Sequence, residues 1–296
     1  MAFVRRARFA WHLRARPLAL GERTLVMGVL NVTPDSFSDG GAFLDPGAAL
    51  GHALSMFDEG ADVIDVGGES TRPGSDQPLG SGEEQDRVLP VIAAILRERP
   101  ASVLSIDTYK ADTARAAIAA GAEIVNDVSG FAWDAAMAGA CADLRCGVIL
   151  THTRGRPNEW RTQGRLAQEE VVPLVKSGLA QSLGRADAAG IDRSRVVLDP
   201  GFGFGKAYDN NYPLLAHLDE FLALGQPLLA GVSGKSFLGR TLAAPGKPDV
   251  PVSARGNATL AATMAAILAG ASIVRVHDVR PAVEAARIGD AILAAL

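Results

Sequence analysis

Short runs of β-branched and aliphatic residues recur along the chain, and each ends in polar residues or glycine. The first run covers residues 25–30 and leads directly into Asn31. Seven more follow, at residues 62–68, 103–108, 124–129, 147–153, 196–201, 228–233 and 273–278. Runs that are apolar throughout, rather than alternating with polar residues, are typical of strands buried on both faces, as in a parallel sheet.

Between these runs, apolar residues recur at the spacing of an α-helix. The expected helices cover residues 46–60, 83–99, 111–121, 166–190, 211–224, 257–270 and 281–296. Pro173 is expected to bend or split the fourth of them, because proline removes a backbone hydrogen bond and clashes with the preceding turn. Three expected helices are followed by glycine and then a strand, and glycine suits the left-handed position that ends a helix.

Eight strands alternating with helices predict a TIM (β/α)8 barrel over residues 25–296 as a single domain. The alternative is an open, doubly wound sheet, which usually carries a GxGxxG turn after its first strand. Here that position reads Asn31-Val32-Thr33-Pro34, which favours the barrel. Residues 1–24 are rich in arginine; we interpret them as a strand or hairpin that caps the bottom of the barrel, and a targeting peptide is the alternative.

Composition narrows the function classes. The net charge of −4 argues against nonspecific nucleic-acid binding, and no apolar run reaches the length of a membrane span. Hydrophobic residues make up 48% of the chain but aromatic residues only 5%, so the core must consist of Ala, Val, Leu and Ile. Cys141 and Cys146 lack the further ligands of a zinc site and fit a reduced, cytoplasmic protein.

Polar residues gather where the predicted strands end, and in a TIM barrel these ends form the active site. A single Asp or Asn at such a point often only caps the next helix, but a whole set converging on one face is harder to explain structurally. The set is Asn31, Asp65, Glu69, Asp107, Asn126, Asp127, His152, Asp199, Lys235, Arg275 and His277.

The residue types in this set suggest a ligand. Asp107, Asn126 and Asp199 offer acceptors to the donor edge of a ring such as a 2-amino-pyrimidinone, and Lys235 can donate to the opposite edge. Arg275 and His277 lie two apart on one strand and therefore point the same way. With Asn31 and the Ser/Thr-rich loop after the first strand, they predict a shallow phosphate site above a deep heterocycle site.

Seven motifs resemble, in order, those of the dihydropteroate synthase family. They are VMGVLNVTPDSFSDGG, GADVIDVGGESTRPGS, SIDTYK, NDVSG, LDPGFGFGK, VSGKSFLG and RVHDV, which together span residues 25–279. The resemblance implies condensation of 6-hydroxymethyl-7,8-dihydropterin pyrophosphate with 4-aminobenzoate in an SN1-like substitution, with Mg²⁺ as cofactor. It also implies competitive inhibition by sulfonamides and a homodimer formed through helices near the C-terminus.

Roles follow from the same resemblance, motif by motif. The pterin would be held by Asp107, Asn126, Asp199 and Lys235. The pyrophosphate would be held by Asn31, Arg72, Arg275 and His277, with Mg²⁺ bound at Asn31 and with Asp35 and Asp39 in the adjoining loop. The aminobenzoate would contact Phe37, Thr71, Pro73, Phe204 and Ser236, beside Lys235. Of all these, Lys235, Asp107, Arg275 and His277 are expected to act in the chemical step.

The chain departs from the family pattern at three positions. Gly234 stands where the family usually has Arg, Thr153 where it has Met, and Ala258 where it has Gly. We therefore expect weaker binding of aminobenzoate and altered sulfonamide sensitivity. Two alternatives remain open at this point: a pterin-binding paralogue without turnover, and a methyltetrahydrofolate:corrinoid methyltransferase-like barrel, which has no need of the loop after Asn31.

Overall fold

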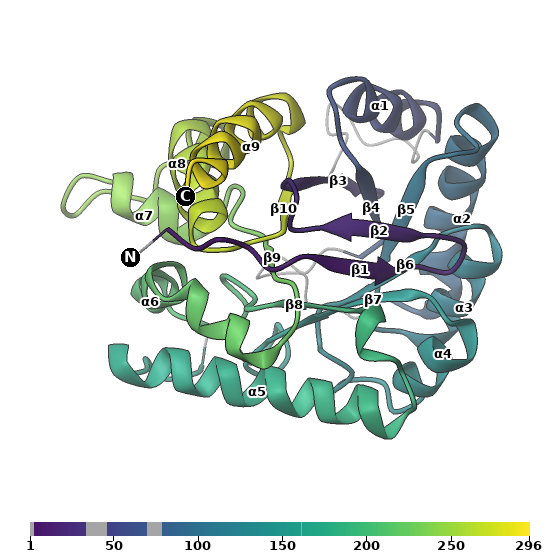
Figure 1. Ribbon diagram of the computed structural model, residues 1–296, viewed down its shortest axis with the longest axis horizontal. Coiled ribbons are helices and arrows are strands. Elements are labelled where there is room, and N and C mark those ends of the chain that lie inside the picture. The colour runs from purple at the N-terminus through teal and green to yellow at the C-terminus, as the bar shows by residue number, and fades with distance from the viewer. Residues whose placement is uncertain (1–2, 34–45, 70–78, 161) are drawn as a thin grey trace.

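The computed structural model describes residues 3–33, 46–69, 79–160 and 162–296. Their backbone forms a ring of parallel strands surrounded by helices (Figure 1). The strands are β3 (Leu25–Asn31), β4 (Val63–Gly67), β5 (Val103–Asp107), β6 (Ile124–Asp127), β7 (Gly147–Thr151), β8 (Val196–Asp199), β9 (Leu229–Ala230) and β10 (Ile273–Val276). All eight predicted strands are present.

The sheet curls until its two edge strands meet. Its order is β8-β7-β6-β5-β4-β3-β10-β9, and every neighbouring pair is parallel. Closure rests on a single parallel bridge between Leu198 and Leu228, supported by the Leu198 amide, which donates to the Pro227 carbonyl at 3.0 Å. The predicted TIM barrel is confirmed, with β9 as its shortest strand.

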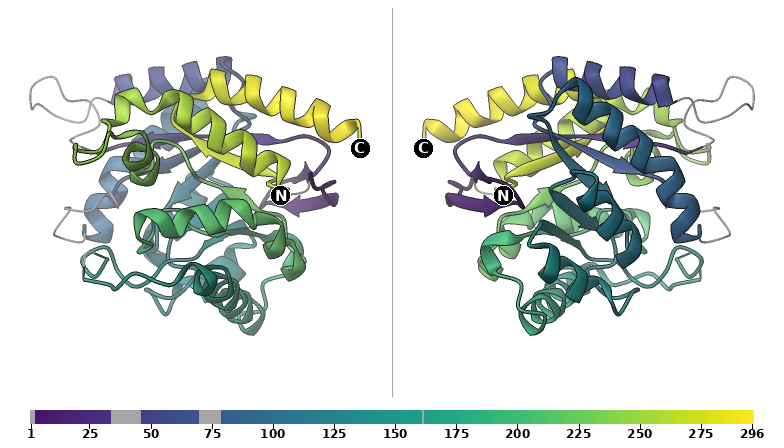
Figure 2. Two further views of the ribbon diagram at one scale, coloured as in Figure 1. Left: turned by 90° about the vertical axis from the view of Figure 1, so that its left-hand side faces the viewer. Right: turned by 90° about the vertical axis from the view of Figure 1, so that its right-hand side faces the viewer.

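The helices cover the outside of the barrel (Figures 1 and 2). They are α1 (Pro46–Asp58), α2 (Ser81–Glu98), α3 (Ala111–Ala119), α4 (Met137–Leu144), α5 (Gln168–Ala188), α6 (Asn211–Ala216), α7 (Ser236–Leu242), α8 (Gly256–Leu268) and α9 (Val279–Ala294). The described residues also form four 3-10 helices: η1 (Arg193–Arg195), η2 (Tyr208–Asn210), η3 (Leu218–Leu224) and η4 (Val252–Ala254).

The helices differ from the prediction in three ways. Helices α4 and α7 were not predicted, because eight and seven residues are too few to show a clear helical period. Pro173 does not split α5, which runs unbroken for 21 residues. The expected helix 211–224 divides into α6 and the 3-10 helix η3, in which the buried Leu218 and Phe221 have the i, i+3 spacing that suits three residues per turn.

Successive residues of each strand pack into two different clusters. One cluster joins Val26, Ile64, Leu104 and their counterparts to the helices. The other lies inside the barrel and joins Met27, Val63, Val103, Ile124, Ile149, Val197, Leu229 and Ile273. This is the two-residue alternation of a strand, and it fixes which side chains face the barrel interior.

An antiparallel hairpin of β1 (Phe9–His12) and β2 (Pro17–Leu20) covers the end at which the barrel strands begin, here called the bottom; it lies in front of the barrel in Figure 1. Trp11, Leu13 and Leu20 are buried in the same cluster as the first inward residues of the barrel strands. The Trp11 indole donates to the Arg195 carbonyl at 2.8 Å, and a Cβ at Gly147 would lie 2.6 Å from the Leu13 side chain. The hairpin therefore closes the bottom by tight apolar packing.

Two further observations concern possible membrane spans and the two cysteines. Across the described ranges, the helices are all too short or too polar to cross a bilayer. Cys141 and Cys146 are free thiols, both buried, one within α4 and the other next to the start of β7.

Candidate active site

The polar residues of the barrel interior lie two residues further along each strand than the residues of its apolar layer. Because inward positions recur every second residue, Asp65 follows Val63, Asn126 follows Ile124, Asp199 follows Val197 and Arg275 follows Ile273. One further step along β5 from Ser105 brings Asp107 to the strand's end. The carboxyl ends of the parallel strands thus bring together residues that are far apart in the sequence.

Arg275 lies at the centre of this set. Its Nε donates to Asp65 Oδ2 at 2.7 Å, and its Nη2 donates to Asp107 Oδ2 at 2.7 Å. Asn126 Nδ2 donates to the same Asp65 oxygen at 2.8 Å. Asn126 and Arg275 are therefore joined through one carboxylate, that of Asp65, and Arg275 in turn binds Asp107.

Asp65 received no role in the sequence analysis, although it was among the strand-end residues. It is fully buried and accepts hydrogen bonds from two residues of the predicted site. The signal in the sequence is the phase of the strand, because Val63, Asp65 and Gly67 share one face. A charged residue on the inward face below the strand end indicates a partner of opposite charge inside the barrel, and Arg275 is that partner.

Burial changes the protonation of the acids. The pKa of Asp107 is raised to about 7: desolvation is the main cause, the charge of Arg275 opposes it, and the negative charges of Asp65 and Glu84 add to the rise. Burial also raises the pKa of Asp199, although the Gly201 amide donates to its Oδ1 at 2.8 Å and opposes the rise. Both carboxyls hold protons more strongly than in water, and both gain from a ligand that brings donors.

Lys235 interacts electrostatically with these acids, and burial shifts its pKa in the opposite direction, downward. Desolvation, with the nearby charge of Arg275, lowers the pKa of Lys235 to about 8, against the raising effects of Asp199 and Asp107. Its Nζ lies 4.4 Å from the centre of the Phe204 ring. A Cβ at Gly203 would come within 3.3 Å of the Lys235 stem, so the glycine leaves room for the lysine to lie along this loop.

A second buried lysine, Lys206, was not predicted as part of the site. Its Nζ donates to the carbonyls of His152, Gly201 and Phe204 at 3.0, 2.6 and 3.1 Å. Burial lowers its pKa well below the ordinary value. Lys206 thus clamps the loop that follows β8 and carries Phe204.

The rim of the barrel holds His277 and Ser236. The Ser233 hydroxyl and His277 Nδ1 are 3.0 Å apart, and both His277 and Ser236 are exposed. Asn31, at the end of β3, is in register with Gly67, which is in register with Asp107. A Cβ at Gly67 would lie 3.7 Å from Asn31 Oδ1 and 3.5 Å from Asp107 Cβ, so the missing side chain leaves space between them.

Gly234, the main departure from the family pattern, lies in a turn with φ of +65°. Its amide donates to Thr259 Oγ1 at 3.1 Å, and its carbonyl accepts from Arg255 Nη1 at 2.7 Å. An arginine at 234 would be strained in this left-handed conformation. The expected loss of aminobenzoate affinity stays a prediction, and a Gly234→Arg substitution would also test backbone strain.

Two further strand-end residues, Asp127 and His152, are buried. Asp127 accepts from the amides of Ser129 and Phe131 and from the Ser129 hydroxyl, which orders the turn after β6, while burial raises its pKa to about 6. His152 is buried, and burial with the nearby charge of Lys206 lowers its pKa to about 2, so its ring is neutral.

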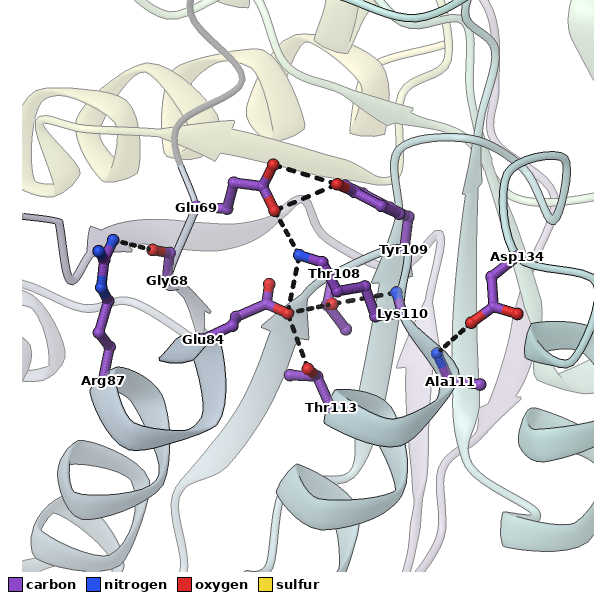
Figure 3. Close-up of polar contacts among 10 residues, drawn as sticks. All are labelled: Gly68, Glu69, Glu84, Arg87, Thr108, Tyr109, Lys110, Ala111, Thr113 and Asp134. Carbon is purple, nitrogen blue, oxygen red and sulfur yellow. Dashed lines mark hydrogen bonds and ion pairs between the residues drawn. The ribbon is translucent and has the colours of Figure 1, made fainter. Parts of the chain in front are cut away.

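Several predicted site residues lie outside the described residues. They are Phe37, Thr71, Arg72 and Pro73, together with the loop acids Asp35 and Asp39. Glu69 is the last described residue before one of these segments, and its carboxylate accepts from Tyr109 and Lys110 (Figure 3).

Comparison with known proteins places this geometry in a family. The model of the pterin binding enzyme family matches residues 27–277. The dihydropteroate synthase of Bacillus subtilis is 42% identical and aligns over 95% of this chain and 93% of its own length. The solved structure of the Yersinia pestis dihydropteroate synthase with a sulfonamide drug complex is 40% identical, covers 97% of this chain and all of its own, and has a TM-score of 0.88. The Xanthomonas albilineans dihydropteroate synthase with 4-aminobenzoic acid is also 40% identical, covering 97% of this chain and 99% of its own with a TM-score of 0.86. The chain therefore belongs to the dihydropteroate synthase family of pterin binding enzymes, transferases of folate synthesis.

Proposed function

We propose that this chain condenses 6-hydroxymethyl-7,8-dihydropterin pyrophosphate with 4-aminobenzoate at the upper end of its barrel. The observation that carries the proposal is the arrangement of Asp107, Asn126, Asp199, Lys235 and Arg275 around one interior space, with acids and bases facing each other. A flat heterocycle with a donor edge and an acceptor edge matches that alternation of charge.

The pterin lies deepest in this assignment. Asp199 and Asn126 accept from and donate to its amino-pyrimidinone edge, and Asp107 accepts from a ring N–H on the other ring. Lys235 donates to a ring oxygen or nitrogen, which its reach along Gly203 allows. These hydrogen bonds satisfy carboxyls whose raised pKa reflects burial without enough donors.

The pyrophosphate leaving group lies above the pterin, near Arg275, His277, Asn31 and Arg72. The amide oxygen of Asn31, beside the space over Gly67, is the kind of hard oxygen ligand that Mg²⁺ prefers, and phosphate oxygens would complete its coordination. A Mg²⁺ ion held by Asn31 would supply charge neutralisation for the departing pyrophosphate. Arg275 is already held by Asp65 and Asp107, so its guanidinium keeps a fixed position beneath the developing negative charge.

The aminobenzoate ring lies against Phe204, with Lys235 and Ser236 beside it and Phe37, Thr71 and Pro73 completing the contacts. The electron-rich dihydropterin delocalises the cation left on its methylene carbon, so the path is SN1-like. A weakly basic aniline nitrogen needs no strong general base. The protein's main tasks are then to orient the two rings and to keep water away from the cation.

The experiment is an assay of pyrophosphate release by the purified chain. Release should require both aminobenzoate and Mg²⁺, and should fall strongly in the Asp199→Asn and Lys235→Met variants. Binding of the pterin without any release of pyrophosphate would instead identify a paralogue without turnover. Release that continues unchanged after chelation of Mg²⁺ would remove the metal from the proposal.

The assembly is proposed as a cytoplasmic homodimer that sulfonamides inhibit in competition with aminobenzoate. Two free, buried thiols fit a reducing compartment. Helices α8 and α9 pack on each other. Ile288 on α9 and Leu296, two residues beyond its end, are exposed and offer an apolar surface near the C-terminus. Analytical ultracentrifugation of the wild type and of an Ile288→Glu variant tests the dimer, because the charge should favour the monomer only if α9 forms the interface.

A further inference from the structure

A cluster of buried charges lies beside the site and takes no part in the proposed contacts with substrate (Figure 3). Its centre is Glu84 on α2, whose side chain is 1% exposed. One carboxylate oxygen, Oε2, accepts from Thr108 Oγ1 at 3.1 Å, from Thr113 Oγ1 at 2.7 Å and from Lys110 Nζ at 3.1 Å. A fully buried carboxylate with three donors on one oxygen is costly to remove from water and needs a reason.

Lys110 extends the cluster to a second carboxylate. Its ammonium also donates to Glu69, and the Tyr109 hydroxyl donates to the two Glu69 oxygens at 3.1 and 3.3 Å. Burial alone would lower the pKa of Lys110, but the hydrogen bond to Glu69 and the charges of Glu84 and Glu69 raise it above its ordinary value. One cation therefore serves two acids, and its removal would leave both unpaired.

The cluster joins the ends of two neighbouring barrel strands. The ladder between β4 and β5 ends at the pair Gly67 and Asp107, and the next helices in the sequence are α2 and α3. Glu69 comes two residues after Gly67, and Lys110 three residues after Asp107. The bridge Glu69–Lys110–Glu84 therefore joins the two segments that follow the last pair of the ladder to each other and to α2.

The segment after β4 is also held against α2, and the segment after β5 is held against β6. A Cβ at Gly68 would lie 2.9 Å from Val88 Cγ1 and 3.2 Å from the Glu84 carbonyl, and Arg87 Nη1 donates to the Gly68 carbonyl at 2.9 Å. In the segment after β5, the Thr108 amide donates to the Asn126 carbonyl at 3.1 Å, and the Lys110 amide donates to Thr108 Oγ1 at 3.2 Å. The residues that flank Asp107 are thus fixed from two directions, while its own carboxylate faces Arg275.

We propose that Lys110 is a positioning residue for the pterin site: by bridging Glu84 and Glu69 it locks the end of β4 to the end of β5 and holds Asp107 in place for the substrate. The inference rests on the proposed function, since Asp107 is assigned there to the pterin. In this proposal Lys110, Glu84 and Glu69 act together to position Asp107, and none of the three contacts the substrate.

The test compares Lys110→Met with a charge-balanced double variant, Lys110→Met/Glu69→Gln, and with Lys110→Arg, which keeps a cation able to bridge two carboxylates. The matched control is Arg16→Met, which removes a cation from the buried Glu123 at the other end of the barrel, where the two are 2.8 Å apart. Two measurements are made on each variant: the melting temperature, and kcat and KM for dihydropterin pyrophosphate.

Lys110→Met should lose about ten- to a hundredfold in kcat/KM, mostly in KM for dihydropterin pyrophosphate, because a small displacement of a binding group has effects of that size. The double variant should melt at a higher temperature than Lys110→Met while its kcat/KM stays as low. Lys110→Arg should exceed Lys110→Met in both melting temperature and kcat/KM. Arg16→Met should lose melting temperature alone.

The proposal is overturned if the double variant recovers kcat/KM together with melting temperature, since the cluster would then be only a buried ion pair. It is equally overturned if Lys110→Met behaves like Arg16→Met. Calorimetric titration with dihydropterin pyrophosphate, in the absence of aminobenzoate, keeps the two proposals apart. If the wild type binds this compound without turnover, the proposed reaction fails, yet an unchanged dissociation constant in Lys110→Met would still count against the positioning role.

Discussion

The two ends of this barrel differ in the side chains that fill them, which are apolar at the bottom and mostly charged or polar at the top. At the bottom, Trp11, Leu13 and Leu20 of the hairpin fill the space beneath Met27, Ile149 and the other first inward residues. At the top, the next inward positions carry Asp65, Asn126, Asp199 and Arg275, and charged groups replace hydrocarbon. The two layers are only one inward step apart on the same strands.

The two layers of this one closed sheet therefore contribute differently to stability and to activity. Among the described residues, the lower layer consists of apolar side chains and of Trp11, whose indole donates to the Arg195 carbonyl, and it contributes mainly burial. In the upper layer the charges hold one another in place, but burial still raises the pKa of Asp107 and lowers that of Lys235, so their charged forms are destabilised in the free protein. Substitutions at the top should therefore change activity first, and substitutions at the bottom should change stability alone.

The largest effect is expected from Arg275→Met. The change leaves Asp65 and Asp107 without their shared cation and removes a fixed charge from the leaving group. We expect kcat/KM to fall by about two to three orders of magnitude, as when one donor to developing charge is lost, and the free energy of unfolding to fall by about 3–5 kcal/mol. Steady-state kinetics and urea denaturation measure the two. An Arg275 variant that keeps kcat/KM within twofold of wild type would contradict the assignment.

The counterpart at the bottom is Trp11→Ala. Removing a fully buried indole should lower the free energy of unfolding by about 3–5 kcal/mol. Below the melting temperature, kcat/KM should stay unchanged. Trp11→Phe is the control, because it keeps most of the packing and loses only the hydrogen bond to Arg195, worth about 1 kcal/mol. A loss of activity in folded Trp11→Ala would mean that the two ends are not separable.

A smaller effect should appear in the pH dependence of stability. The pKa of Asp107 is about 7 in the folded protein, above the value of about 4 for an unfolded chain. The contribution of this carboxyl to stability is therefore complete below about pH 4 and is lost as the pH rises through about 7. In melting scans from pH 5 to pH 8, wild type should lose stability relative to Asp107→Asn, and the exposed Asp143→Asn control should follow wild type. A constant difference across this range would show that Asp107 is ionised throughout.

The pKa values of Asp107 and Lys235 in the folded protein predict the pH profile of catalysis. The value of kcat/KM should rise as Asp107 ionises near pH 7 and fall as Lys235 loses its proton near pH 8, which gives a narrow maximum. The two limbs belong to the interacting set of groups rather than to single residues, since Arg275 acts on both. A broad plateau from pH 6 to pH 9 would be the contrary result.

The smallest expected effect concerns Trp160. Its ring meets Phe204 edge-on, with centres 5.4 Å apart, and its indole donates to the Gly155 carbonyl at 3.1 Å. Trp160→Leu should raise KM for aminobenzoate by about two- to tenfold, in line with the strength of an aromatic pair. KM for the pterin substrate should not change, and Trp160→Phe should restore much of the loss. Equal changes in both KM values would indicate a wider disturbance of the loop.

The predictions from sequence succeeded where the cause is local. Strand and helix periods arise from neighbouring residues, so the eight strands and the barrel could be read directly. Short or irregular helices, such as α4 and η3, could not, because their few residues carry little periodic signal. Pro173 lies in a helix held by tertiary packing of Val171, Val175 and Leu179, and this packing outweighs the local penalty.

The same limit applies to the site. The sequence alone placed Asp107, Asn126, Asp199, Lys235 and Arg275 at strand ends, because the fold sends every strand end to one face. Only the tertiary structure decided that Asp65 joins Arg275 to Asn126, that Lys206 clamps the Phe204 loop, and that Glu84 reaches Lys110 from another helix. A local period determines which way a side chain points, but its partner depends on how the closed sheet sets the register of distant strands and how the helices pack around it.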